Sequence, residues 1–242
     1  MLKTFSVTDI GRKRKLNQDY VYASEQAVGN LPNLFIVADG MGGHKAGDFA
    51  SKCTVETICD LASRSFEKNP VLILRKAIET ANGSIRRKSA EDECYEGMGT
   101  TVVAASCLGK YLQIANVGDS RLYVIGEEIR QITKDHSLVE EMIRMGGIDR
   151  SVARNHPDKN IITRAIGAND TVDIDLFSVE LKPREKVLMC SDGLTNMLED
   201  EEIRRIVQGP GSIEGRAREL VSAANDRGGK DNISVILIEQ TA

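Results

Sequence analysis

The sequence predicts an α+β domain in which antiparallel strands form layers and helices cover them. Two long helical patterns come first, over residues 46–66 and 70–88, and a series of short apolar strands follows them. Strands are therefore grouped together and do not alternate one by one with helices, which disfavours a parallel βαβ sheet. At 242 residues, with 41% apolar and 28% charged residues, the chain suits one soluble domain. No repeat or linker divides it, so we expect a single domain over residues 1–242.

Each helical pattern has its own local justification. The first places Phe49, Cys53 and Ile58 on one face. The second begins at Pro70, a residue favoured at the first helical position, and continues with helical spacing through Ile85.

The apolar period changes at residue 99. Residues 99–133 contain short strands separated by Leu108-Gly109-Lys110, Gly118-Asp119 and Gly126-Glu127, and this spacing predicts a meander of antiparallel hairpins. The polar stretch 148–169 is long enough to suggest either a flap with a function or a surface loop. The other expected elements are a short helix over 137–145, strands over 171–180 and 186–191, helices near 199–208 and 212–226, and a last strand over 232–239.

Composition excludes several classes of function. The net charge is −4, so no general basic field attracts nucleic acid or a membrane surface. No signal-like segment opens the chain, and no run approaches the ~18 apolar residues of a membrane span. The five cysteines are scattered and odd in number, which is typical of buried, reduced thiols. We expect a cytoplasmic, monomeric protein.

Five aspartates mark the ends and starts of apolar strands. Three of them (Asp39, Asp119, Asp192) follow a strand, and two (Asp19, Asp231) precede one. In antiparallel sheets the end of one strand lies beside the start of its neighbour, so all five carboxylates can gather at one edge of the layers. A single Asp-Gly is more typical of a turn, but the recurrence favours a shared site. Unpaired carboxylates would repel, and their hard oxygen atoms favour Mg²⁺ or Mn²⁺ as the neutralising ions.

Eight stretches together resemble the metal-dependent serine/threonine protein phosphatases of the type 2C, or PPM, family in their bacterial form. They occur in the family's order and extend to the last strand. The stretches are RKLNQD (14–19), VADGMGGH (37–44), GMGTT (97–101), NVGDSRLY (116–123), ITKDHSL (132–138), ITRAIG (162–167), CSDGL (190–194) and KDNISVI (230–236). The resemblance implies two antiparallel sheets packed as a sandwich with helix pairs outside.

The resemblance also implies the ligands of two metal ions. Asp19 and Asp39 resemble the ligands of one ion, together with the backbone carbonyl of Gly40. Asp39, Asp192 and Asp231 resemble the ligands of the other, so Asp39 would bridge the two. A water held between the ions would then attack phosphorus in line and expel the serine or threonine alkoxide.

Further roles follow from the resemblance. Asp119 resembles a ligand of a third ion, Arg14 the arginine that binds the substrate phosphate, and residues 137–169 the family's flap. Many members carry a histidine where this chain has Met41, and His44 stands three residues later as a candidate substrate-binding group. Proteins carrying phosphoserine or phosphothreonine, including a cognate serine/threonine kinase, are the implied partners.

Other chemistries fit the sequence less well. No arginine stands six residues after any cysteine, as a cysteine phosphatase requires, and no phosphate-binding glycine motif is present. Asp173 and Asp175 form a D-x-D pair, but they alternate with apolar residues as the polar face of a strand does. His136 is expected to be structural, and His156 to lie at the surface. A phosphopeptide- or metal-sensing module without turnover, and a hydrolase of small phosphate esters, remain as alternatives.

Overall fold

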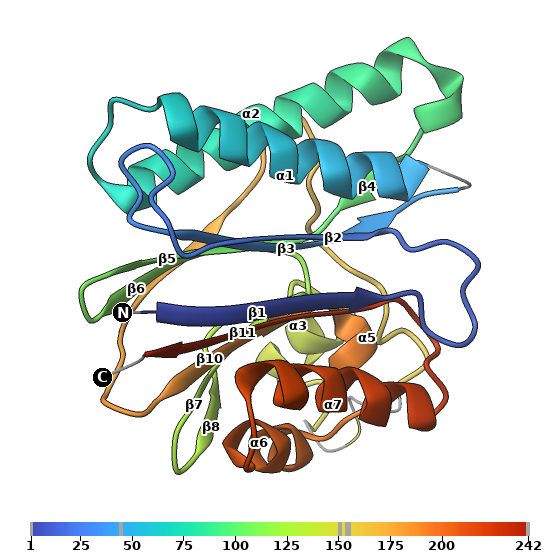
Figure 1. Ribbon diagram of the computed structural model, residues 1–242. Helices are drawn as coiled ribbons and strands as arrows, with labels where there is room; N and C mark the ends of the chain where they lie inside the picture. Colours follow the sequence, from blue (N-terminus) through green and yellow to red (C-terminus); the bar gives the residue numbers. More distant parts are fainter. Residues whose placement is uncertain (1, 44–45, 150–151, 153–155, 241–242) are drawn as a thin grey trace.

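The computed structural model describes residues 2–43, 46–149, 152 and 156–240, and shows two antiparallel sheets stacked face to face (Figure 1). In the described residues, the first sheet has the strand order β1-β11-β10-β7-β8 and the second β2-β3-β5-β6-β9, with β4 paired to β3. The first sheet consists of β1 (Leu2–Asp9), β11 (Ile233–Gln240), β10 (Lys186–Cys190), β7 (Arg121–Ile125) and β8 (Ile129–Gln131). The second consists of β2 (Asp19–Ser24), β3 (Leu34–Met41), β5 (Val102–Leu108), β6 (Tyr111–Val117), β9 (Asp175–Glu180) and the short β4 (Gly99–Thr100).

Helices cover both outer faces, so the predicted sandwich with helix pairs outside is confirmed. The pair α1 and α2 lies over the second sheet, and α6 and α7 lie over the first (Figure 1). Apolar side chains fill the space under each helix pair and the space between the two sheets. The helices are α1 (Ala46–Arg64), α2 (Pro70–Glu91), α3 (Leu138–Arg144), α5 (Asp192–Thr195), α6 (Asp200–Gln208) and α7 (Ile213–Asp226), with a 3₁₀ turn at Glu93–Tyr95.

Local sequence explains where the long helices begin. The side chain of Asn69 accepts a hydrogen bond from the backbone N–H of Val71, and Pro70 occupies the first position of α2. Ser212 caps α7 in the same way, with its hydroxyl accepting from Gly215 N. The buried residues of α2, from Ile73 to Ile85, recur at helical spacing, as predicted.

The predicted meander is wrong at one point. β6 and β7 lie in different sheets, so the chain crosses between the sheets at Gly118-Asp119 where we expected a hairpin. Both strands are buried almost throughout, because both sheets have one face against the other and one face under helices. An apolar strand therefore looks the same in sequence whether the next turn returns to its own sheet or changes sheets.

One smaller expectation also changes. Cys94 is exposed in the surface turn after α2, whereas Cys107 and Cys190 are buried as expected. All five thiols are free in the part of the chain that the structure describes. Within these same residues, no helix is both long and apolar enough to span a membrane.

Candidate active site

The aspartates come together at one end of the stacked sheets. Asp19 and Asp39 face each other in register across β2 and β3 of the second sheet. Asp192 is the first residue of α5, two residues beyond the end of β10, and Asp231 lies two residues before β11, both next to the first sheet. Asp119 lies in the crossover between the sheets. Strands from both layers therefore deliver carboxylates to the same place.

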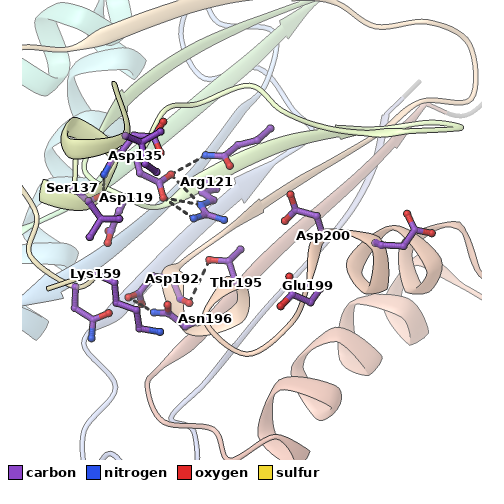
Figure 2. Close-up of a pocket in the computed structure, with 16 residues that line it drawn as sticks. Asp119, Arg121, Asp135, Ser137, Lys159, Asp192, Thr195, Asn196, Glu199 and Asp200 are labelled. Carbon is purple, nitrogen blue, oxygen red and sulfur yellow. Dashed lines mark hydrogen bonds and ion pairs between the residues drawn. The ribbon is translucent and has the colours of Figure 1, made fainter. Parts of the chain in front are cut away.

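A small cavity of about 230 Å³ opens at this place. Six residues predicted from the sequence line it: Arg14, Asp39, Gly40, Asp119, Asp192 and Asp231. Asp19 is buried beside Asp39 and is 5% exposed. A neighbouring cavity of about 550 Å³ shares Asp119 and Asp192 with the first and extends towards α3 and α6 (Figure 2).

Protein donors hold one oxygen atom of each of three carboxylates. The Ser191 hydroxyl donates to Asp19 Oδ2 over 2.7 Å. Asn196 Nδ2 donates to Asp192 Oδ2 over 2.8 Å (Figure 2). Arg14 Nη2 donates to Asp231 Oδ2 over 2.7 Å. The other oxygen atoms of Asp19 and Asp192, both Oδ1, are buried and have no hydrogen-bond partner. Buried carboxylate oxygen atoms without partners are destabilising unless a proton or a cation satisfies them.

The pKa values of the aspartates also reflect their burial and the repulsion between their carboxylates. Burial, reinforced by the neighbouring carboxylates, raises the pKa of Asp19 to about 7 and that of Asp192 to about 6. Burial and the charges of Asp19 and Asp192 raise the pKa of Asp39 well above its usual range. The pKa of Asp119 is also raised well above its usual range, by burial and by Asp192. The cluster therefore carries more negative charge than the protein itself neutralises.

The chemistry of these side chains suits a divalent cation. They offer hard oxygen atoms, two of which lack any partner, and this is the donor set that Mg²⁺ and Mn²⁺ prefer. In the described part of the chain, however, no three histidine, cysteine, aspartate or glutamate side chains are arranged to hold a metal ion as they stand. Their assignment as metal ligands is accordingly a proposal.

The backbone around Asp39 is fixed by neighbours that the sequence did not reveal. Asp39 N–H donates to Thr101 Oγ1 over 3.0 Å, and Asp39 O accepts from Thr101 N over 2.9 Å. The next residue, Gly40, packs so tightly that an added Cβ would lie 2.0 Å from Gly47 O. No side chain fits there, which explains the glycine that follows the aspartate.

Asn232 is a second residue that sequence reasoning missed. It is 4% exposed, and its Nδ2 donates to the carbonyls of Ile10 and Leu16 while its Oδ1 accepts from Gln18 N. These three bonds fix the loop that carries Arg14 against the start of β11. A polar residue at the start of an otherwise apolar strand was the available signal.

The histidines take different positions. His136 is buried and hydrogen-bonded through both ring nitrogen atoms, as expected of a structural residue, and burial lowers its pKa. His156 is partly buried, with Nδ1 accepting from Asp158 N. Met41 lines the small cavity, and His44 lies outside the described residues. Asp175 forms an ion pair with Arg164 and lies 3.2 Å from His136 Nε2, so it belongs to a structural network.

Comparison with known proteins identifies the relatives of this chain. The family model described as Protein phosphatase 2C matches residues 11–237. The serine/threonine phosphatase stp of Listeria monocytogenes is 40% identical over an alignment of 242 positions, which covers 96% of this chain and 94% of the relative.

Solved structures agree in fold over nearly the whole length. The serine/threonine phosphatase Stp1 from Staphylococcus aureus superposes with a TM-score of 0.94 at 37% identity, covering 100% of this chain and 96% of that one. The catalytic domain of the serine threonine protein phosphatase PstP, in complex with two manganese ions, superposes with a TM-score of 0.87 at 31% identity, covering 98% of this chain and 97% of that one.

Proposed function

Because the chain belongs to the protein phosphatase 2C family and is a serine/threonine protein phosphatase, we propose that its turnover depends on Mg²⁺ or Mn²⁺ held by the aspartate cluster. The supporting observation is the pair of buried, partnerless oxygen atoms, one on Asp19 from the second sheet and one on Asp192 beside the first. The two manganese ions in the PstP structure support the choice of ion and the number of sites.

We propose a role for each carboxylate. Asp19, Asp39 and the carbonyl of Gly40 would hold one ion, and Asp39, Asp192 and Asp231 the other. Asp119, in the crossover, would hold a more weakly bound third ion together with Asp192. Bound there, divalent cations would lower the pKa of a water molecule and direct it at phosphorus.

The chain's own residues bind and orient the substrate. Arg14 lies at the rim of the cavity with its side chain 51% exposed, so its planar guanidinium can reach a phosphate from solvent. A guanidinium can donate to two phosphate oxygen atoms at once, which fixes the orientation of the ester. In the structure Arg14 donates to Asp231, which shows that it reaches the cluster. Asn196 and Ser191 orient the carboxylates of Asp192 and Asp19.

The substrates of a serine/threonine phosphatase are proteins that carry phosphoserine or phosphothreonine. We propose that a cognate serine/threonine kinase is among them. We also propose that residues 1–242 act as one domain, in which residues 137–169 form a flap beside the cavity.

The test is hydrolysis of p-nitrophenyl phosphate and of a phosphothreonine peptide by the protein after chelation. We expect the chelated protein to lose at least about a hundredfold in rate with both substrates, and Mn²⁺ or Mg²⁺ to restore it, because ions at such a site supply several kcal/mol. Activity that survives thorough chelation would contradict the proposal. Manganese binding without hydrolysis of either substrate would favour a sensing module, and hydrolysis of the small ester alone a small-phosphate hydrolase.

Arg14→Ala is expected to raise KM for the phosphothreonine peptide and to lower kcat/KM roughly ten- to a hundredfold. The physical reason is the loss of a charge-assisted contact, which contributes about 1.5–3 kcal/mol. Manganese affinity measured by calorimetry should change little. Lys15→Ala is the matched control, because Lys15 is an exposed basic residue directly after Arg14 and does not line the cavity. If both variants behave like the wild type, Arg14 does not bind substrate.

A further inference from the structure

Asp119 lies in the crossover between the sheets. His136 connects this crossover to Asp175 of the second sheet and to the ends of segment 138–161. It is 5% exposed and lies outside the aspartate cluster. Its backbone N–H donates to Gly118 O over 3.0 Å, and the backbone N–H of Gly118 donates to His136 Nδ1 over 3.1 Å. The two residues are thus hydrogen-bonded in both directions. Gly118 immediately precedes Asp119.

These contacts determine the tautomer of the imidazole. Because a backbone N–H can only donate, Nδ1 must accept and carries no proton. The ring proton therefore lies on Nε2, which is 3.2 Å from Asp175 Oδ2 and 3.4 Å from Arg164 Nη1. Asp175 is held in turn by Arg164, whose Nη1 donates to Asp175 Oδ1 over 3.0 Å. One side of the ring thus faces the crossover, and the other faces a strand of the second sheet.

The crossover packs closely against Thr101 at Gly118. Gly118 has φ +104°, and a Cβ there would lie 2.6 Å from the side chain of Thr101. Thr101 Oγ1 in turn accepts from Asp39 N–H and is hydrogen-bonded to Ser120 Oγ over 2.8 Å. A displacement of Gly118 would therefore press on Thr101, which is hydrogen-bonded to Asp39 and to Ser120, the residue that follows Asp119.

His136 also lies where the segment 138–161 leaves and rejoins the sandwich. Its carbonyl accepts from Thr163 N over 2.8 Å, and Leu138 N donates to Ile161 O over 2.8 Å. Ser137 and Ile162 form a bridge between these two bonds. The two ends of this segment are thus fastened to each other directly beside His136.

We propose that His136 is a positioning residue that places Asp119 through the Gly118 N–H···Nδ1 hydrogen bond and fastens the crossover to both ends of segment 138–161. This inference rests on the proposed function in one readout only, turnover, because turnover depends on the role proposed for Asp119. The hydrogen bond and the tautomer are measured independently of it.

Two substitutions separate the two sides of the ring. In His136→Asn the side-chain oxygen atom can replace Nδ1 as acceptor for Gly118, while the donor to Asp175 is lost. In His136→Gln the side-chain amide reaches towards Asp175, and Gly118 N–H loses its acceptor. Each variant gives up one ring contact, so each serves as the control for the stability of the other.

We expect amide exchange at Gly118 to stay within about threefold of wild type in His136→Asn and to accelerate at least tenfold in His136→Gln. With saturating Mn²⁺, kcat/KM should fall about tenfold or more in His136→Gln, as for other groups that orient a metal ligand, and remain near wild type in His136→Asn. In an Asp119→Ala background, which is expected to be slow but active, His136→Gln should change kcat/KM less than threefold further.

Several results would overturn this proposal. One is equal behaviour of the asparagine and glutamine variants in Gly118 exchange. Another is a loss in His136→Gln that is undiminished in the Asp119→Ala background. If neither His136 variant folds, the ¹⁵N shifts of the imidazole in the wild-type protein decide: protonated Nε2 supports the proposal, and protonated Nδ1 refutes it. An Asp119→Ala variant as active as wild type would instead count against the role proposed for Asp119.

Discussion

Asp39→Asn is expected to abolish turnover while leaving the fold intact. Asp39 lies beside Asp19 in the second sheet, and its pKa is raised by burial and by each of the other four aspartates of the cluster. It is therefore the residue best placed to contact two cations. Losing a ligand shared by two ions, the role proposed for Asp39, would remove several kcal/mol of transition-state stabilisation, which corresponds to about a thousandfold or more in kcat.

The fold should survive because the carboxylate does not support it. The hydrogen bonds that hold residue 39 to Thr101 come from the backbone, and asparagine has nearly the same shape as aspartate. The substitution also removes one buried negative charge from a cluster that repels itself. Without divalent cations, the variant should therefore melt at or above the temperature of the wild type.

Thermal melts with and without Mn²⁺ separate these effects. At a hundredfold excess over Kd, a bound ion stabilises the native state by about 2.7 kcal/mol, which raises Tm by roughly 5–11 °C in a chain of this size. The wild type should show this rise, and Asp39→Asn should show little of it. Asp173→Asn is the matched control, since Asp173 is exposed and outside the cavity. Near-normal rates in Asp39→Asn would show that Asp39 does not bridge.

The sequence predicted where the carboxylates meet better than it predicted the path of the chain between them. Asp19 and Asp39 were correctly expected to meet, because strand ends and starts alternate in an antiparallel sheet and this depends only on local pattern. The crossover at Gly118-Asp119 was taken for a hairpin. Which sheet a strand joins is decided by contacts distant in sequence, such as that of Gly118 with Thr101.

The residues that orient the site were the least predictable. Ser191, Thr101 and Asn232 are ordinary polar residues in sequence, and each becomes informative only when its buried partner is known. Serine and asparagine also occur widely in turns, so their presence beside a strand end carries little information. By contrast, the aspartates were recognisable because charged groups beside apolar strands are rarely found without a partner.

Gly193→Ala is expected to cause a large loss of stability beside the site. A Cβ on Gly193 would lie 1.9 Å from the carbonyl oxygen of Asn232 and 2.9 Å from its carbonyl carbon. Both are backbone atoms, so no side-chain rotation relieves the clash, and α5 must move away from the start of β11. Overpacking typically costs about 1–3 kcal/mol, and a backbone contact this short belongs at or above the upper end.

The same displacement separates Asp192, which precedes Gly193, from Asp231, which precedes Asn232. We therefore expect Gly193→Ala to lower Tm by roughly 6–12 °C, at 2–4 °C per kcal/mol, and to weaken manganese binding by calorimetry. Gly83→Ala is the matched control, because Gly83 is exposed in α2 with no atom within 4 Å of an added Cβ. There the same methyl group should stabilise the protein by about 0.5–1 kcal/mol, as alanine does in helices. If Gly193→Ala melts and binds manganese like wild type, α5 and β11 can move apart freely, and the close contact does not set the distance between the two aspartates.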